Sequence, residues 1–591
     1  MIHLIAISLL VVVIPASAAS YYDYIVVGAG VAGSVLASRL SEDAGITVLL
    51  LEAGAEPNLV LRSPASPFLA TDTDRDWRYF SEPLEYCGDF VNDRKMRLST
   101  GKVLGGGTIL NAITWVRESR KGFKIWKEMG INGWSYEENL PYFIKSEKVN
   151  IRKFKSSKAR GHDGPIRIAM TNFQTDIPQA IINAGGESGY RTDFDYNDKF
   201  RLGFFRGQQN LDKGLRFDAV RAYIDPVRSR KNLEIRTKAL VKRVIFDDSM
   251  RATGVEYEDN EGDTHIVYVN YEVVMAAGGL STPKIILQSG IGPKERLKAV
   301  GIKQLLELPV GKNLQDHFGC FGHQYSINRD MISFGVSTLT GATNVSAQSP
   351  GAGLSNFMNW GAFLNTADGP HDPEDFADVQ VMGVEMAFDK MQTLFRAYFN
   401  VNKTYWDETF AHKRLSATAS VFAYTYLLDY RTTGEVYLRS NDHKDKPIID
   451  IQYFKDPEEV NILIRAFKII DNIMNSKTMS KFKPKHFAIK VPGCPYDPDP
   501  QHDGYLECMI RAMPMTIYHF VGTMRMGNDT DRNSVVDEQL RMRGVRNVRV
   551  VDGSVLPRNT MGNPMATIYM VAERASDLIR GRRLLPPIYD Y

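Results

Sequence analysis

The stretch Tyr22-Asp-Tyr-Ile-Val-Val-Gly28-Ala-Gly30-Val-Ala-Gly33 opens a strand–turn–helix pattern near the start of the chain. The β-branched run before Gly28 predicts a short buried strand, and residues 34–40 predict a helix. Residues 46–52 predict a second buried strand that ends at Glu52. The three segments form a βαβ unit, which is the context in which a G-x-G-x-x-G turn binds a dinucleotide.

Each glycine of this turn has a physical task in that interpretation. Gly28 allows a tight turn, Gly30 lets the backbone approach a pyrophosphate at the helix N-terminus, and Gly33 lets helix and strand pack closely. Glu52 would accept hydrogen bonds from ribose hydroxyls, and its charge disfavours the 2′-phosphate of NADP.

A second glycine-rich loop indicates which of the two dinucleotides, NAD or FAD, the protein binds. It reads Gly101-Lys-Val103-Leu-Gly105-Gly106-Gly107-Thr108-Ile-Leu-Asn111. Consecutive glycines let a flat ring lie against bare backbone. A cofactor that needs two such loops, far apart in sequence, is long and bipartite, which favours FAD over NAD.

Length and composition limit the architecture and the partners. The chain has 591 residues, 43% hydrophobic and 24% charged, with a net charge of +3. This is a globular composition, and the length exceeds the roughly 250–300 residues at which one core stops growing. No block of like charges stands out, so no nucleic-acid or membrane partner is expected.

We therefore predict an α/β protein with a discontinuous FAD-binding Rossmann-like domain and an inserted α+β substrate-binding domain. The FAD-binding domain is predicted over 20–324, with some substrate-domain segments, and again over 516–591. The inserted domain is predicted over 325–515.

The first 19 residues read as a signal peptide. An apolar run over 4–14 is followed by Pro15 and then by small residues, so we expect a secreted protein. In that case the sequons at Asn344, Asn402 and Asn528 are glycosylation sites. The four cysteines, Cys87, Cys320, Cys494 and Cys508, allow two disulfides in three connectivities, or free buried thiols. No zinc-type spacing occurs, so no metal site is expected.

Several further motifs together give a family resemblance. They are Leu51-Glu-Ala-Gly54, the loop 101–111, Gly278-Gly-Leu-Ser-Thr-Pro283 with Leu287-Gln-Ser-Gly-Ile-Gly292, Leu308-Pro-Val-Gly-Lys-Asn-Leu-Gln-Asp-His317, His519-Phe-Val-Gly-Thr523 with Met526-Gly527, Val551-Asp-Gly-Ser554 and Gly562-Asn-Pro564. With these motifs the chain resembles the glucose–methanol–choline (GMC) flavoprotein oxidoreductases over essentially its whole length.

The resemblance implies an FAD-dependent enzyme that oxidises an alcohol. It assigns FAD contacts beyond Gly28, Gly30, Gly33 and Glu52 to Val31, Ala32, Trp77, Val103, Gly106, Thr108, Asn111, Val241 and Asp552. Leu110 stands where some relatives carry a histidine linked to the flavin, so the FAD is predicted to be non-covalent.

The resemblance also assigns the catalytic pair, His519 and Asn563. Histidine, with an ordinary pKa near 6.5, suits the task of taking the hydroxyl proton while hydride leaves carbon for the flavin. Asn563 would orient the alcohol oxygen. Because Pro564 follows it, Asn563 also reads as the N-cap of a helix.

The substrate is less well specified by the sequence. Phe357, Trp360, Tyr424 and Tyr426 suggest an aromatic-lined pocket, and cues for a quaternary amine such as choline are absent. The short leader and the overall pattern look like those of arthropod members, among which a millipede type oxidises an aromatic cyanohydrin. By this resemblance the expected substrate is mandelonitrile and the expected product is benzoyl cyanide. Three activities stay open. The enzyme is an oxidase that converts O2 to H2O2, a dehydrogenase that passes electrons to a quinone, as glucose dehydrogenases of the family do, or a non-redox hydroxynitrile lyase.

Overall fold

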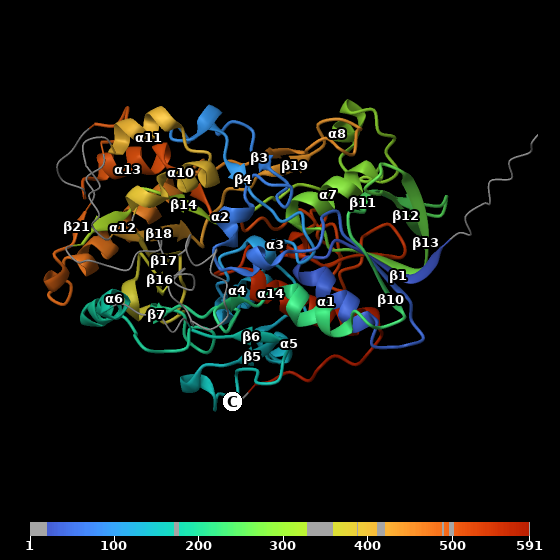
Figure 1. The fold of residues 1–591 in the computed structure, drawn as a ribbon, viewed down its shortest axis with the longest axis horizontal. Helices are drawn as coiled ribbons and strands as arrows, with labels where there is room; N and C mark the ends of the chain where they lie inside the picture. Colours follow the sequence, from blue (N-terminus) through green and yellow to red (C-terminus); the bar gives the residue numbers. More distant parts are fainter. Residues whose placement is uncertain are drawn as a thin grey trace, which may run out of the picture.

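The computed structural model describes residues 20–170, 176–327, 359–386, 388–410, 420–486, 490–495 and 501–589. Two β-sheets lie side by side in Figure 1, with β1 and β10–β13 on the right and β16–β18 on the left. This confirms a mixed α/β fold with a nucleotide-binding unit and a second unit beside it.

The first sheet contains the predicted βαβ unit. Strand β1 (Tyr21–Val27) leads through α1 (Val31–Leu40) to β2 (Val48–Leu51), and the two strands pair in parallel. The strand order is β10-β2-β1-β13-β12-β11, and β23 pairs in parallel with β13. The added strands are β10 (Leu233–Arg236), β11 (Leu240–Phe246), β12 (Ala252–Glu258), β13 (Thr264–Met275) and β23 (Val548–Val550).

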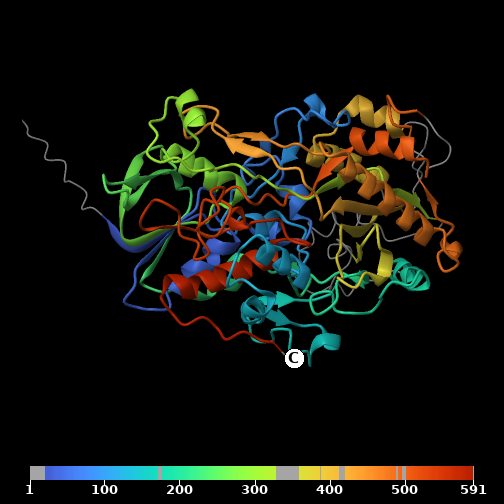
Figure 2. The same ribbon diagram turned by 180° about the vertical axis from the view of Figure 1, so that it is seen from behind.

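The C-terminal helix completes this unit. Helix α14 (Met565–Ile579) packs against α1 and against α5 (Tyr136–Ser146), and Figure 2 shows it as the long red helix beside α1. The start and the end of the chain therefore build one core. The other helices of this half of the molecule are α2 (Ser66–Ala70), α3 (Gly107–Leu110), α4 (Arg120–Glu128), α7 (Gly278–Gln288) and α8 (Lys294–Ala299).

The second sheet is antiparallel and has the order β21-β15-β18-β17-β16-β7, with β14 joining β18 to β22. Its central strand β18 is buried along its whole length. The strands are β7 (Gly203–Arg206), β14 (Phe318–Cys320), β15 (Gln324–Ser326), β16 (Trp360–Leu364), β17 (Val379–Met386), β18 (Ser420–Leu427), β21 (Lys485–His486) and β22 (Pro514–Thr516).

Helices surround the second sheet, namely α6 (Asp176–Glu187), α10 (Phe388–Phe399), α11 (Lys403–Phe410), α12 (Pro457–Met474) and α13 (Asp503–Ala512). Strands β7 and β14 come from within the predicted segment 20–324, so the second sheet is not confined to 325–515. The domain boundaries themselves stay a prediction.

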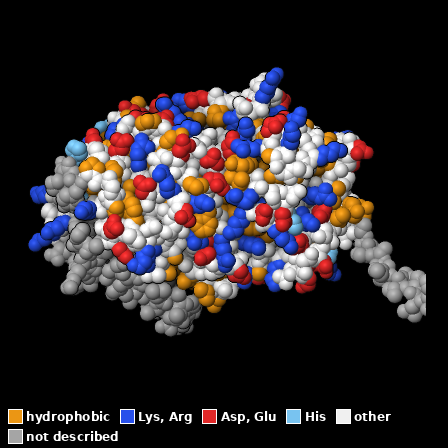
Figure 3. All heavy atoms as spheres, turned by 90° about the horizontal axis from the view of Figure 1, so that it is seen from above, with side chains coloured by type: hydrophobic (Ala, Val, Ile, Leu, Met, Phe, Trp, Pro, Cys, Tyr) orange, Lys and Arg blue, Asp and Glu red, His pale blue; other side chains and the backbone are white. Residues whose placement is uncertain are grey.

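One disulfide joins Cys494 to Cys508, whereas Cys87 and Cys320 are buried free thiols. The cysteines thus form one bridge and two thiols, a combination of the two alternatives. The leader 1–19 and the sequon at Asn344 lie outside the described residues. Among the described helices none is long and apolar enough to cross a membrane. On the face that Figure 3 shows, basic and acidic side chains are interspersed, as expected from the small net charge.

Candidate active site

A cavity runs from the carboxyl ends of β1 and β2, at Val27 and Leu51, to the segment after β22. Most predicted site residues line it. They are Gly28, Gly30, Val31, Ala32, Glu52, Trp77, Gly106, Asn111, Val241, His519, Asp552 and Asn563. The structure therefore brings the predicted nucleotide site and the predicted catalytic pair into one cavity.

Three residues that were predicted to contact FAD do not line the cavity. Val103 is fully buried. The hydroxyl of Thr108 donates to the carbonyl of Gly105 (2.6 Å) and accepts from the backbone N–H of Ala219 (3.1 Å). Gly33 packs against the first turn. These residues shape the loops instead of lining the cavity, and they are absent from its lining.

The glycines of the two predicted loops have two different roles, one in the fold and one beside the cavity. A Cβ on Gly33 would lie 1.8 Å from the carbonyl oxygen of Gly28, and Gly28 itself has a positive φ of 96°. These two positions need glycine for the fold. A Cβ on Gly30 or Gly107 would meet no other protein atom within 4 Å, although both residues line the cavity. The space in front of these two backbones fits a pyrophosphate and a flat ring.

Glu52 is held at the end of β2 by two backbone groups. Its carboxylate accepts from the N–H of Ala29 (3.0 Å) and from the N–H of Gly54 (2.8 Å). Burial raises the pKa of Glu52 to about 7. Each carboxylate oxygen keeps a further lone pair, which suits the hydroxyl donors of a ribose.

The loop that ends at Asn111 rests on an arginine that the sequence did not suggest. The Arg216 guanidinium donates to Oδ1 of Asn111 (2.5 Å) and to its carbonyl (2.6 Å). Arg216 is fully buried, and this burial lowers its pKa to about 9. The side-chain nitrogen of Asn111 donates one hydrogen to the sulfur of Met565 (2.9 Å), and its second hydrogen remains available as a donor.

Asp552 holds the start of helix α7 beside the cavity. Its carboxylate accepts from the Thr282 hydroxyl (2.7 Å) and from the N–H groups of Gly278 and Ser554 (both 2.8 Å). Burial raises the pKa of this carboxyl group. Asp552 therefore orders the start of α7 beside the predicted cofactor.

The segment after β22 aims His519 at the cavity. Tyr518 has a left-handed backbone with φ 65°, a conformation that costs a non-glycine residue about 1–3 kcal/mol. The backbone N–H of His519 donates to Oδ1 of Asp316 (2.7 Å), and its carbonyl accepts from the Asn559 side chain (3.1 Å). Both sides of the His519 backbone are thus fixed.

The His519 ring lies between two polar side chains. Its Nε2 atom is 3.3 Å from Nδ2 of Asn563, and its Nδ1 atom is 2.8 Å from Nδ1 of His317. Burial holds the pKa of His519 well below its usual value of 6.5. The ring is therefore neutral near neutral pH and can accept a proton.

Asn563 does not cap a helix, which corrects the prediction. Helix α14 begins at Met565 with Pro564 as its N-cap, and no side chain caps it. The Asn563 amide is instead held by Nε2 of Gln380, which donates to its Oδ1 atom (3.2 Å). The side chain is directed into the cavity, so its role lies in the site and not in helix capping.

His317 and Gln380, which contact the predicted catalytic pair, were not predicted from the sequence. His317 ends the motif 308–317, so that motif was a signal that could have found it. Gln380 lies in β17 with no local signal, because its contact with Asn563 is purely tertiary. Of the four predicted pocket aromatics, Tyr424 lines the cavity, Trp360 and Tyr426 are buried outside its lining, and Phe357 lies outside the described residues.

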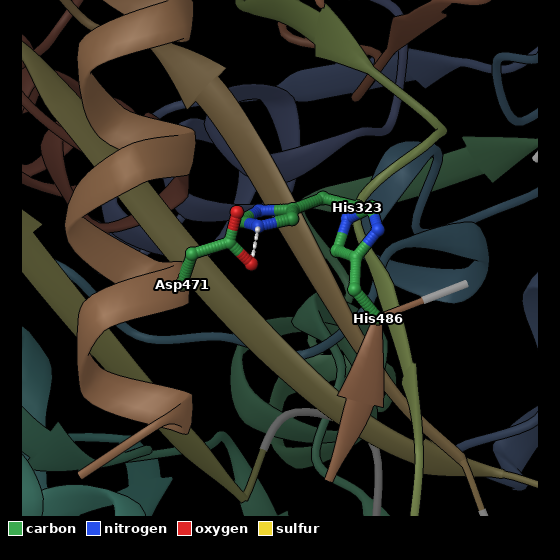
Figure 4. Close-up of side chains that lie close together, drawn as sticks. All are labelled: His323, Asp471 and His486. Carbon is green, nitrogen blue, oxygen red and sulfur yellow. Dashed lines mark ion pairs between the residues drawn. The ribbon is translucent and has the colours of Figure 1, made fainter. Parts of the chain in front are cut away.

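A second group of polar side chains lies in the second unit, away from this cavity. Figure 4 shows His323, Asp471 and His486, whose donor atoms lie within 4.8 Å of one another. The Tyr325 hydroxyl lies between two of them. It accepts from Nε2 of His323 (2.8 Å) and donates to Asp471. We interpret the group as a buried hydrogen-bond network, because Tyr325 holds the space that an ion would need.

Comparison with known proteins agrees with this geometry. Family models described as GMC oxidoreductase match residues 22–319 and 430–572. An oxygen-dependent choline dehydrogenase of Rhizobium rhizogenes is 32% identical over 567 residues, which cover 95% of this chain and 96% of that protein. One from Staphylococcus epidermidis is also 32% identical, over 96% of this chain and 95% of its own length.

Solved structures show the same fold. Pyridoxine 4-oxidase from Mesorbium loti has a TM-score of 0.78 and 25% identity, covering 95% of this chain and all of that one. A fungal aryl-alcohol oxidase has a TM-score of 0.74 and 22% identity, covering 94% of this chain and 98% of that one.

A two-sheet fold with a dinucleotide turn, and a histidine–asparagine pair at the far end of the same cavity, defines a flavin-dependent alcohol oxidoreductase. The chain belongs to the GMC oxidoreductase family. Its cofactor is FAD, and the open backbone at Gly30 and Gly107, the carboxylate of Glu52 and the amide of Asn111 are the groups that would hold it.

Proposed function

We propose that this enzyme oxidises an uncharged alcohol with a flat, aromatic or similarly apolar body, and that O2 is its electron acceptor. The observation that carries the proposed substrate class is the distribution of charge around the cavity, whereas the proposed acceptor rests on the similarity to oxygen-dependent and oxidase relatives. Among its described lining residues, the only lysines and carboxylates are Glu52, Lys242, Lys284 and Asp552. All four lie in the nucleotide-binding unit.

Away from these charged groups, the cavity wall is apolar and aromatic, and we call this part the aromatic wall. Strand β17 places Gln380 beside Asn563, and Met382 follows on the same face, directly across from Tyr424 on β18. Two further aromatic rings, Tyr398 and Tyr518, have their centroids 5.3 Å apart. Phe68 lies 5.0 Å from the Tyr398 ring. These side chains supply flat faces for an aromatic substrate.

The catalytic step follows from the two polar groups at this end. Bound FAD supplies the hydride acceptor. When the alcohol binds, its hydroxyl group replaces the Asn563 N–H at Nε2 of His519. Nε2 then accepts the hydroxyl proton, and the Asn563 amide donates to the alcohol oxygen. Since His519 is neutral, no prior deprotonation is needed. His519 then holds the proton while the carbonyl product leaves.

Mandelonitrile is the specific substrate that we propose to test first. Its phenyl ring matches the aromatic wall, its nitrile is uncharged, and oxidation of its secondary alcohol gives benzoyl cyanide. With O2 as the acceptor, one H2O2 forms for each alcohol oxidised. A glucose substrate finds less support, because a sugar needs more polar partners than this wall offers.

Choline is the second candidate, favoured by the names of the similar relatives and by one structural observation. A quaternary ammonium group binds over aromatic faces, and several line this cavity. The described part of the substrate wall lacks a carboxylate that would strengthen such binding, so we rank choline below an uncharged alcohol.

An anaerobic screen of alcohols and cyanohydrins, scored by loss of flavin absorbance, tests these proposals. We expect mandelonitrile or benzylic alcohols to bleach the enzyme faster than choline or glucose. Production of H2O2 under air then identifies an oxidase, whereas bleaching without peroxide identifies a dehydrogenase that needs a quinone. Release of cyanide and benzaldehyde without bleaching identifies a lyase and refutes the proposal.

Two further proposals accompany this function. Leu110 lines the cavity and offers no nucleophile, so we propose that FAD is bound without a covalent bond. Acid precipitation should then leave a colourless pellet, and a yellow pellet would refute the proposal. We also propose that residues 1–19 direct secretion. Expression of the full chain in insect cells should give protein in the medium that begins near Ser20.

A further inference from the structure

We propose that His317 is a positioning residue that sets the tautomer of His519, so that the proton-accepting nitrogen on the substrate side is Nε2. The inference rests on the proposed role of His519 as the base and extends it to the groups behind the ring. It follows from four consecutive hydrogen bonds in which every donor points the same way.

The first step is the carbonyl of Thr560, which can only accept. Nε2 of His317 lies 2.9 Å from this oxygen and must therefore carry a proton. The His317 ring is completely buried, and its hydrogen-bond partners among the described residues are His519 and the Thr560 carbonyl, neither of which is acidic. Burial lowers the pKa of His317 to about 3. The ring is neutral, so its other nitrogen, Nδ1, is an acceptor.

The second step fixes the catalytic ring. Nδ1 of His317 lies 2.8 Å from Nδ1 of His519. Since the His317 nitrogen is the acceptor, the His519 nitrogen must be the donor. A neutral imidazole has one N–H, and it is used here. Nε2 of His519 therefore keeps its lone pair, and that atom is the one that lies next to Asn563.

The hydrogen bonds at the other end of this series lead independently to the same tautomer of His519. Nε2 of Gln380 donates to Oδ1 of Asn563 (3.2 Å), which turns the Asn563 NH2 group toward His519. At 3.3 Å this NH2 group needs an acceptor on Nε2 of His519. Gln380, Asn563, His519 and His317 thus donate in sequence, ending at the Thr560 carbonyl, and hydrogen bonds aligned in this way strengthen one another.

The arrangement matters during turnover. When Nε2 of His519 takes the alcohol proton, its Nδ1–H stays bonded to His317, so the ring gains charge without having to rotate. Without an acceptor at position 317, His519 could place its single proton on Nε2, and in that tautomer it cannot act as the base. A wrong tautomer costs a catalytic histidine up to about 10⁴-fold in other enzymes.

The test compares His317→Phe with His317→Asn. Phenylalanine keeps a ring in the buried site but removes the acceptor, whereas the asparagine oxygen can replace Nδ1. We expect His317→Phe to slow flavin reduction by about tenfold or more with little change in the substrate concentration for half-saturation. His317→Asn should retain most of the rate. Flavin absorbance reports whether each variant folds and holds FAD.

The tautomer is read directly by long-range ¹H–¹⁵N correlation spectra of the ¹⁵N-histidine-labelled holoenzyme, with His519→Asn to assign the signal. We expect the proton on Nδ1 of His519 in the wild type and a shift toward Nε2 in His317→Phe. A wild-type proton on Nε2, or equal rates in His317→Phe and His317→Asn, would overturn the proposal. The spectra need no substrate, so they remain decisive even if no tested alcohol bleaches the flavin.

Discussion

Nε2 of His519 lies 3.3 Å from Nδ2 of Asn563, and the two side chains face the same end of the cavity. The contact joins the loop after β22 to the residue before the N-cap of α14. The two residues share one site, and we propose different tasks for them, proton transfer for His519 and orientation of the alcohol oxygen for Asn563. Their variants should therefore differ in size of effect.

Replacement of the base gives the largest expected loss. His519→Ala should slow flavin reduction by about 10²-fold or more, because general base catalysis contributes 10²–10⁴-fold. FAD should remain bound, since the glycine turn and Glu52 are untouched. Stopped-flow bleaching under nitrogen measures the rate. His162→Ala is the control, because the His162 ring hydrogen-bonds to the Ser157 carbonyl and does not line the cavity. An unchanged rate in His519→Ala would exclude its assignment.

Asn563→Ala should have a milder effect. The alcohol oxygen loses one neutral hydrogen bond, worth about 1 kcal/mol, so a reduction rate lower by about five- to tenfold is expected. No loss of a helix cap should accompany it, because α14 has no side-chain cap. Thermal unfolding should therefore stay close to that of the wild type. A rate as low as that of His519→Ala would contradict this division of tasks.

The pH dependence should reflect the depressed pKa of His519. A histidine with its pKa well below 6.5 stays neutral at that pH and loses its capacity to accept a proton only in more acidic solution. We expect kcat/KM to stay flat as the pH falls through about 6.5 and to decline well below it. An acid limb centred near or above pH 6.5 would show that the folded pKa is not lowered. Flavin absorbance across the same range controls for loss of FAD.

The glycine turn offers a matched pair of variants. Gly30→Ala adds a methyl group that meets no protein atom within 4 Å, so the apoprotein should unfold at nearly the wild-type temperature while FAD binds more weakly. Gly33→Ala places its methyl 1.8 Å from the Gly28 carbonyl oxygen and should lower the free energy of unfolding by about 1–3 kcal/mol or more. Calorimetry and FAD titration separate the two effects. Equal FAD affinity in Gly30→Ala and the wild type would place the pyrophosphate elsewhere.

The parts of the site that the sequence predicted depend on local patterns. The turn around Gly28 and the acidic end of β2 follow from strand periodicity and glycine spacing, and the structure places them as expected. Gln380 and Arg216 carry no such pattern, since their roles arise only where distant segments meet. The prediction that Asn563 caps a helix was wrong, because it relied on a local pattern alone. Local propensity favoured it, but tertiary contacts with Gln380 and His519 engage the same amide.

The base is connected to the second sheet without a flexible linker. Strand β22 ends at Thr516, whose hydroxyl donates to Asp316 (2.5 Å), and the same carboxylate holds the backbone of His519. We therefore expect a displacement of this sheet, which carries Met382 and Tyr424 of the proposed substrate wall, to shift His519 as well. We expect substitutions that change the substrate preference through this sheet to change the turnover rate too, so both should be measured for each variant.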